Sequence, residues 1–212
     1  MAETAAPAET VNSVRGARRS PAEHLADAFT SGSIPGTVTL TELPYQTMVG
    51  VRVDTASDAG ARVASVTGGL PAASGEVTAS GSVSTLWLGP TEFLVVAPEE
   101  FHDSLGGSLV GDLTTALGSD SGQVVDLSAN RTTFELSGSH ARAVLEKTCS
   151  LDLHPRVFKA GTALSTELAH IPVVLWKTSD ETYRILPRAS FADFLGRWIL
   201  DAMREYASPE VP

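Results

Sequence analysis

The sequence predicts an α+β protein built from two similar halves, each with a mostly antiparallel sheet and helices packed on it. One unit occurs twice: a strand that carries a tryptophan, a polar turn, an apolar strand and an amphipathic helix. It surrounds Trp87 in the first half and Trp176 in the second. Further strand patterns precede each unit, so the predicted order is roughly strand–helix–strand–strand–helix, given twice. The halves share this pattern rather than a clear residue-by-residue similarity.

These patterns divide the 212 residues into four regions. They are a flexible leader with a short helix at 1–33, a first α+β half at 34–120, a second at 121–207 and a frayed tail at 208–212.

The elements of the first region and first half follow from local signals. Ser20, Pro21 and Glu23 form an N-terminal capping pattern, which predicts a helix over 20–29. Apolar residues alternating with polar ones, and a hairpin around Gly89-Pro90, predict strands. The strands are expected at 37–43, 48–53 and on both sides of the turn in 83–97, with a weakly indicated helix at 61–66. An acidic first turn after Pro98 predicts a helix to Leu117, which Gly106 and Gly107 weaken or split.

The second half has stronger patterns. Strands are expected at 123–127, 132–136, 163–169, 171–176 and 182–186, and a helix at 140–149. Ser139 is the expected cap of that helix, and Pro172 predicts an edge or a bend. The closing helix, 190–206, should begin with a capping pair of Ser190 and Asp193. Its apolar stripe at helical spacing is Phe191, Phe194, Leu195, Trp198, Ile199, Ala202 and Tyr206.

Composition excludes several classes of function. With 15 Lys and Arg against 25 Asp and Glu, the net charge is −10, which disfavours binding to nucleic acids and to anionic membranes. The single cysteine, Cys149, cannot form an internal disulfide. No apolar run approaches the roughly 20 residues of a membrane span, and the N-terminus lacks an apolar signal core. We therefore expect a soluble, cytoplasmic protein.

No residue can be assigned to catalysis, to cofactor binding or to a metal from motifs. The sequence lacks a dinucleotide-binding Gly-x-Gly-x-x-Gly, a phosphate-binding loop, His-Glu-x-x-His, Cys-x-x-Cys and Gly-x-Ser-x-Gly. The densest polar cluster runs from Cys149 to Arg156. Asp152 and His154 in it could act as acid and base. Alternatively, they satisfy backbone groups in a loop after a helix, while Leu151 and Leu153 enter the core, and this simpler interpretation is favoured.

Other candidate residues are isolated. The histidines at 24, 102, 140, 154 and 170 are scattered, so a Ser–His–Asp triad could form only in space. Arg188 could meet a carboxylate of a partner or simply be solvated. The three tryptophans, Trp87, Trp176 and Trp198, could stack on a planar ligand, but they fit core positions better.

Several strings resemble one known family. They are Trp87–Leu94 in the hairpin, Val125–Ser128, Ser137-Gly138, Ala141-Arg142, Cys149–Pro155, Phe158–Gly161 and Arg188–Ala192. Together they are similar to the gamma subunit of heterotetrameric sarcosine oxidase. The resemblance covers residues 80–206 well and residues 20–79 only loosely.

The resemblance implies a fold like the folate-binding domains of the glycine-cleavage aminomethyltransferase. It also implies a non-catalytic structural subunit that works with alpha, beta and delta subunits. Such a complex converts sarcosine to glycine and hydrogen peroxide, with formaldehyde or 5,10-methylenetetrahydrofolate as the one-carbon product. FAD, FMN, NAD and tetrahydrofolate are expected on the other subunits. The folate-binding Asp and Arg of the aminomethyltransferases have no identifiable counterpart in this sequence.

Two other functions stay open. One is a stand-alone folate-binding or aminomethyltransferase-like protein. A related iron–sulfur assembly family carries a Lys-Gly-Cys-Tyr string, where this chain has Lys147-Thr148-Cys149-Ser150, which disfavours that reading. The other is a small hydrolase, which the missing Gly-x-Ser-x-Gly disfavours.

Overall fold

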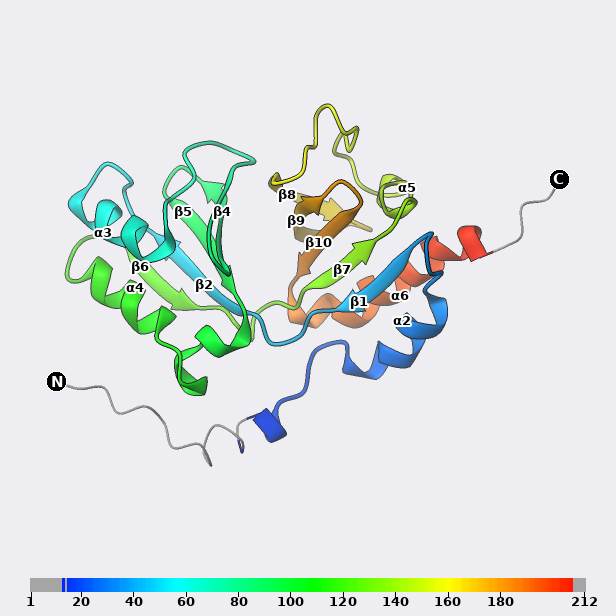
Figure 1. The fold of residues 1–212 in the computed structure, drawn as a ribbon, viewed down its shortest axis with the longest axis horizontal. Coiled ribbons are helices and arrows are strands. Elements are labelled where there is room, and N and C mark those ends of the chain that lie inside the picture. The colour runs from blue at the N-terminus through cyan, green and yellow to red at the C-terminus, as the bar shows by residue number, and fades with distance from the viewer. Residues whose placement is uncertain (1–12, 14, 208–212) are drawn as a thin grey trace. The chain divides into compact units, whose positions relative to one another are not determined.

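The computed structural model describes residue 13 and residues 15–207 and divides the chain into two compact units (Figure 1). The first unit holds residues 45–128 and the described residues of the segment that ends at Arg19. The second unit holds Ser20–Pro44 and residues 129–207. The predicted tail at 208–212 and most of the predicted leader lie outside the described residues.

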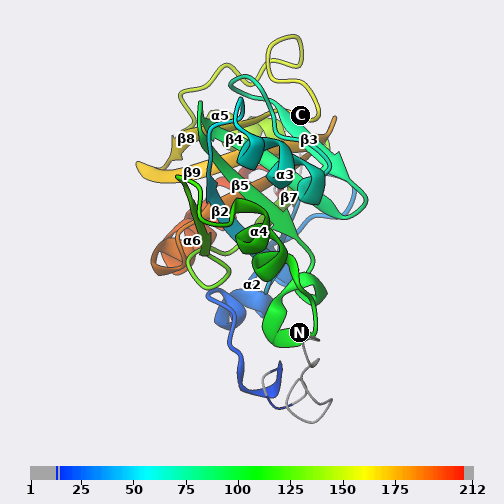
Figure 2. The same ribbon diagram turned by 90° about the vertical axis from the view of Figure 1, so that its left-hand side faces the viewer.

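The first unit contains a five-stranded antiparallel sheet in the order β3-β4-β5-β2-β6. Its elements are β2 (Thr47–Arg52), α3 (Asp58–Thr67), β3 (Val77–Ser80), β4 (Val83–Gly89), β5 (Glu92–Ala97), the short 3₁₀ helices η2 (Glu99–Phe101) and η3 (Asp103–Leu105), α4 (Leu109–Leu117) and β6 (Gln123–Asp126). In Figure 2 the helices α3 and α4 lie in front of the strands and cover one face of this sheet. The core between sheet and helices is mostly aliphatic, with Val49, Val51, Val63 and Leu113 fully buried.

The second unit contains a sheet of the same size, in the order β1-β7-β10-β9-β8. Its elements are η1 (Glu23–Leu25), α2 (Ala26–Gly32), β1 (Thr39–Glu42), β7 (Phe134–Ser137), α5 (Ala141–Glu146), β8 (Ala163–Leu168), β9 (Ile171–Ser179), β10 (Thr182–Pro187), η4 (Ala189–Phe191), α6 (Ala192–Met203) and η5 (Arg204–Ala207). Helices α2 and α6 run side by side along this sheet (Figure 1). The rings of Phe29 and Phe134 meet edge to face, with centroids 5.6 Å apart, and join helix to sheet.

The two halves of the sequence exchange one strand. Strand β1 precedes β2 in the chain but pairs with β7, and β6 precedes β7 but pairs with β2. Position by position, β3, β4, β5, β2 and β6 of one sheet correspond to β8, β9, β10, β7 and β1 of the other. Each sheet therefore takes its edge strand from the other half of the sequence.

The α+β class and the antiparallel sheets are confirmed, but the chain is divided differently from the predicted halves. Because β1 pairs with β7, residues 20–44 belong to the second unit, and the units meet in the chain at Ser128 rather than near residue 120. Strand β3 was not predicted, since its segment is rich in small residues with a weak pattern. Pro172 lies in an inner strand, at a position where the neighbouring strand β10 has already ended, because pairing with β10 begins at Val173.

Two predicted helix caps and the extent of one helix are wrong. The Ser20 hydroxyl donates to Glu42, and neither η1 nor α6 has a side-chain cap. Asp193 accepts hydrogen bonds from Arg197 and contacts His24 instead. The helix predicted from Pro98 is split at Gly106 and Gly107, as expected, but the part before these glycines forms the 3₁₀ helices η2 and η3, and regular helix begins only at Leu109. Tertiary partners for the polar side chains outcompeted the local capping geometry.

The Ser139 cap is also wrong, because His140 is the N-cap of α5 and makes no side-chain capping hydrogen bond. The Ser139 hydroxyl lies 3.1 Å from Nδ1 of His140 instead. A side-chain cap that was not predicted is Ser57, whose hydroxyl accepts from the Gly60 N–H at 3.0 Å at the start of α3.

The closing helix α6 is confirmed, but its buried face is rotated from the predicted one. The buried positions are Ala192, Leu195, Gly196, Ile199, Ala202 and Met203. Phe191 and Phe194 are 37% and 53% exposed. Gly196 sets the rotation, because a Cβ there would lie 2.9 Å from Leu25 Cδ1 and 3.0 Å from Phe29 Cζ. A small residue at that point allows α2 to approach closely.

Candidate functional site

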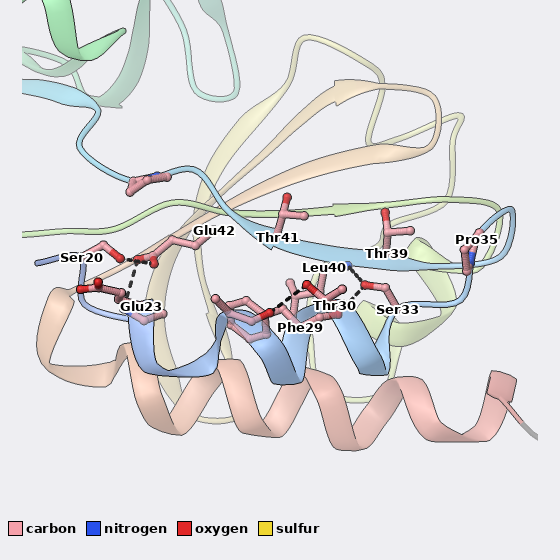
Figure 3. Close-up of a pocket in the computed structure, with 13 residues that line it drawn as sticks. Ser20, Glu23, Phe29, Thr30, Ser33, Pro35, Thr39, Leu40, Thr41 and Glu42 are labelled. Atoms are coloured by element: carbon pink, nitrogen blue, oxygen red, sulfur yellow. Dashed lines mark hydrogen bonds between the residues drawn. The ribbon is translucent and has the colours of Figure 1, made fainter.

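A groove of about 650 Å³ lies between α2 and the edge strand β1 of the second unit (Figure 3). Its floor is apolar, formed by the buried side chains of Ala22, Phe29 and Leu40. Exposed residues of both elements form the walls, among them Ala26 and Thr30 on α2. A groove with an apolar floor and a polar rim is typical of a binding surface.

Glu42 closes one end of the groove and holds its two walls together. Its Oε2 accepts from the Ser20 hydroxyl at 2.6 Å, and its Oε1 accepts from the Ala22 N–H at 3.2 Å (Figure 3). The buried Thr132 hydroxyl donates to the same Oε1 at 2.5 Å. The carboxylate thus does the work of a cap at the start of η1, from a residue about 20 positions away in the chain.

Ser33 joins α2 to β1 at the other end of the groove. Its hydroxyl donates to the Phe29 carbonyl at 2.7 Å and accepts from the Leu40 N–H at 3.0 Å. The Leu43 N–H donates to the Thr133 carbonyl, on the side of β1 that pairs with β7. Because backbone groups alternate in direction along a strand, those of Leu40 and Glu42 point to the outer edge of the sheet. Ser33 satisfies one of these groups, and the Leu40 carbonyl and the Glu42 N–H point along the same edge.

The groove therefore combines apolar surface with part of a strand edge. Its hydroxyl and carboxylate groups at Ser20, Ser33 and Glu42 are already bonded within the unit. Such a surface suits the binding of an extended polypeptide segment, which gains apolar burial and main-chain hydrogen bonds together.

The Cys149–Arg156 segment has the favoured, structural arrangement. Asp152 Oδ1 accepts from the His154 N–H at 2.9 Å, and His154 Nδ1 accepts from the Arg156 N–H at 3.2 Å. Leu153 is 1% exposed and Leu151 packs on the core. Cys149 Sγ lies 3.9 Å from the Thr166 hydroxyl. The Asp152 and His154 side chains bond to the backbone of the loop and shape it, and Cys149 contacts β8.

The structure brings one serine, one histidine and one aspartate together, at Ser104, His102 and Asp126. Ser104 Oγ lies 2.8 Å from His102 Nδ1, and His102 Nε2 lies 2.9 Å from Asp126 Oδ2. The Ser104 backbone N–H also donates to Nδ1, at 3.1 Å, which makes His102 the cap of η3. Burial acts to raise the pKa of Asp126, but hydrogen bonds from Ser128 and His102 outweigh it and hold that pKa below its usual value. This arrangement ties the η2–η3 segment to the end of β6.

The remaining candidates lie apart from the groove. Trp176 is 8% exposed, with the Arg184 guanidinium 5.2 Å from its ring, while Trp87 and Trp198 are half-buried against the two cores. Arg188 is exposed. Within residues 13 and 15–207, no group of three or more His, Cys, Asp or Glu side chains is placed to hold a metal ion.

Sequence reasoning missed the groove because its walls come from a helix and a strand whose contact depends on tertiary packing. The sequence nevertheless contains a pattern that identifies Glu42 as an inward-facing residue. Val38 and Leu40 occupy the inward positions of an alternating strand, and Glu42 continues that inward phase. A charged residue in an apolar phase indicates a bonded, structural carboxylate. Of the helices in the described part of the chain, none combines the length and apolar character needed to cross a lipid bilayer.

Comparison with known proteins gives a family. Residues 52–205 match the sarcosine oxidase, gamma subunit family. A sarcosine oxidase subunit gamma from Arthrobacter sp is 50% identical over 196 residues, covering 92% of this chain and 94% of the relative. The one from Corynebacterium sp. (strain U-96) is 47% identical over 198 residues, with the same coverage of both chains. The predicted resemblance is confirmed.

Solved structures agree. A chain of the heterotetrameric sarcosine oxidase from Corynebacterium sp. U-96, in complex with pyrrole 2-carboxylate, is 47% identical with a TM-score of 0.86. The match covers 92% of this chain and 99% of that one. Glycine cleavage system aminomethyltransferase T from Bartonella henselae is 14% identical with a TM-score of 0.58, over 83% of this chain and 48% of that one. The second match shows a shared fold, as the sequence resemblance implied.

Proposed function

Because this chain belongs to the sarcosine oxidase gamma subunit family, we propose that it is the gamma subunit of a heterotetrameric sarcosine oxidase and has a structural, non-catalytic role. The match to a chain of a solved heterotetrameric enzyme over 92% of this chain carries the proposal. That match extends over both units, so both units would be part of the complex.

The proposed complex contains alpha, beta and delta subunits beside this chain and works in the cytoplasm. It would oxidise sarcosine to glycine and hydrogen peroxide, with formaldehyde or 5,10-methylenetetrahydrofolate as the one-carbon product. FAD, FMN, NAD and tetrahydrofolate would be bound by the other subunits. The names of the relatives support the substrate. In the described segment from Cys149 to Arg156, the bonded loop geometry supports a structural rather than a chemical role.

Native mass spectrometry of the tagged chain, purified gently from its own host, tests the proposal. We expect one copy of this 22.2 kDa chain with three unlike subunits and retained flavin. A bare monomer that oxidises nothing and binds tetrahydrofolate would overturn the proposal in favour of a stand-alone folate-binding protein.

The groove between α2 and β1 is the proposed contact for an extended, apolar segment of a partner subunit. Its strand edge and apolar floor are the features that such a segment uses. An obligate subunit must present apolar surface to its partners, and a groove keeps that surface partly shielded before assembly.

A lysine placed in the groove tests this contact. Thr30 lines the groove and Ser31 does not, although both are exposed hydroxyl residues of α2 that bond within the helix. Thr30→Lys should lower the recovery of partner subunits about tenfold or more, because burying an unpaired charge is costly. Ser31→Lys should leave recovery unchanged. Equal recovery with both variants would remove the groove from the interface.

A further inference from the structure

A second cavity, of about 370 Å³, lies within the second unit near the end of the β9–β10 hairpin. Its lining includes Ser139, Arg142, Lys177, Asp180, Glu181 and Tyr183. Asp180 and Glu181 are exposed, whereas Lys177 and Tyr183 are each 1% exposed. The cavity thus opens near the hairpin turn and reaches a basic, phenolic interior.

Lys177 is an unusual residue for its position. It follows Val173 and Leu175 on the core-facing side of β9, and it pairs across the sheet with Tyr183. Its Nζ donates to the Phe158 carbonyl at 3.2 Å and lies 5.7 Å from the centre of the Tyr183 ring. An ammonium group has three N–H donors, and a buried one is costly unless its charge is neutralised. The Phe158 carbonyl accepts from only one of these three N–H groups.

The hydroxyl of Tyr183 is another buried donor at this cavity. Its ring is stacked parallel to that of Phe158, with centroids 6.3 Å apart, and this packing fixes the side chain. Its hydroxyl is buried and has no hydrogen-bond partner among the residues that the structure describes. Burial raises the pKa of this phenol above 10.0, although the charge of Arg142 acts in the opposite direction. The hydroxyl is therefore protonated at neutral pH and able to donate.

Arg142 supplies a second positive charge at the cavity. It lies on α5, with 41% of its side chain exposed, and its ion pair with Glu146 is long, at 3.7 Å. A half-exposed guanidinium with a loose partner can turn toward a bound anion at little cost. Lys177, Tyr183 and Arg142 are three donor groups around one cavity, and of the buried pair the lysine has one acceptor and the phenol none among the described residues.

From this convergence we propose that the cavity binds a small oxyanion, a carboxylate or a phosphate, with Lys177 and Tyr183 donating to it and Arg142 closing over it. The oxyanion would neutralise the buried ammonium and accept from the phenol. The exposed Asp180 and Glu181 near the opening would favour small anions of low charge over large polyanions. This site is separate from the groove and from the residues proposed to contact partner subunits.

The test is calorimetric titration of the full chain with inorganic phosphate and, separately, with acetate, at constant ionic strength. We expect saturable binding of at least one of them with one site per chain. Phosphate binding alone identifies a phosphate site, acetate binding alone a carboxylate site, and either supports the proposal. Absence of saturable binding for both anions overturns it.

Three variants assign the binding to the cavity. Lys177→Met keeps the unbranched stem and should weaken binding about tenfold or more. Tyr183→Phe keeps the stacking on Phe158 and should weaken it about fivefold, which remains measurable if the lysine variant does not fold. Arg52→Gln removes the same charge from an exposed ion pair of the first unit and should change nothing. Binding that is unaffected by Tyr183→Phe, or weakened as much by Arg52→Gln, overturns the assignment.

Discussion

In the part of the chain that the structure describes, the core of the second unit contains 23 buried residues, against 12 in the core of the first. The sheets have the same strand order, so the difference comes from what covers them. The first unit has α3 and α4 on a mostly aliphatic core. The second has α2, α5 and α6, and aromatic side chains such as Phe29, Phe134 and Tyr183.

The larger core also carries a buried lysine that the smaller one lacks at the matching position. Glu42 and Lys177 both lie on the core-facing side of their strands, β1 and β9. In the first unit the counterparts of these strands are β6 and β4. Asp126 continues the inward phase of β6 as Glu42 does in β1, whereas the inward positions of β4, Thr85 and Trp87, are uncharged. The groove and the cavity adjoin Glu42 and Lys177. One strand order thus supports a mostly aliphatic core in the first unit and a buried lysine beside a cavity in the second.

The largest expected effect comes from the aromatic pair that joins helix to sheet in the second unit. Phe134→Ala should lower the free energy of unfolding by about 3–5 kcal/mol, since it leaves a cavity beside Phe29. Phe194→Ala, at a half-exposed position of α6, should change it by less than about 0.5 kcal/mol. Urea unfolding followed by circular dichroism measures both. Similar losses would mean that Phe194 packs against something in solution that the fold does not show.

The next effect separates inward from outward carboxylates. Glu42→Ala should lower the free energy of unfolding by about 2–3 kcal/mol, because the buried Thr132 hydroxyl and the Ala22 N–H lose their acceptor. Glu42→Gln keeps one acceptor oxygen and should cost less. The control is Glu92→Ala, whose exposed ion pair with Arg52 contributes about 0–1 kcal/mol. Equal losses for Glu42 and Glu92 would contradict the distinction between inward and outward carboxylates.

Much of the fold could be predicted from local patterns in the sequence. The hairpin around Gly89-Pro90, the helix α6 and the loop from Asp152 to His154 depend on neighbours a few residues apart. The exchange of β1 and β6 could not be predicted, since it pairs Thr39 with Ser137 across 98 positions, and strand patterns do not identify partners. The predicted capping pairs failed for a related reason. Ser20 and Asp193 found partners far away in the chain, namely Glu42 and His24.

The groove and the cavity show what sequence reasoning overlooked. Local alternation marks Glu42 as inward in its strand, and Lys177 as inward in the run Val173, Leu175, Lys177. A charge in the apolar phase of a strand needs a compensating partner, so it points to a bonded network or to a ligand. Known sequence motifs do not contain this signal. Tertiary contacts decide between a bonded network and a ligand site. Glu42 accepts from three donors and belongs to a bonded network, whereas Lys177 has a single acceptor.

The smallest expected effect is a pH dependence that belongs to the first unit. The pKa of Asp126 lies below 3.8 because its hydrogen bonds with Ser128 and His102 outweigh burial. A carboxylate with a lowered folded pKa adds stability above its unfolded pKa and loses it as the pH falls through the folded value. Asp126→Asn should therefore cost up to about 1 kcal/mol at pH 7, since the group is half-exposed and screened, and the cost should decrease as the pH falls below the ordinary value of 3.8.

Urea unfolding of both forms at pH 7, 4 and 3 measures this difference. Asp193→Asn is the matched control in the second unit, where hydrogen bonds from His24 and Arg197 also lower the carboxyl pKa but the side chain is more exposed, at 52% against 42% for Asp126. Its effect should be smaller than that of Asp126→Asn at pH 7. If the Asp126 variant instead lost as much stability at pH 3 as at pH 7, the aspartate would act through the shape of the turn it forms with Ser128 rather than through its charge. The link between η3 and β6 would then depend on contacts that the neutral asparagine of the same size does not reproduce.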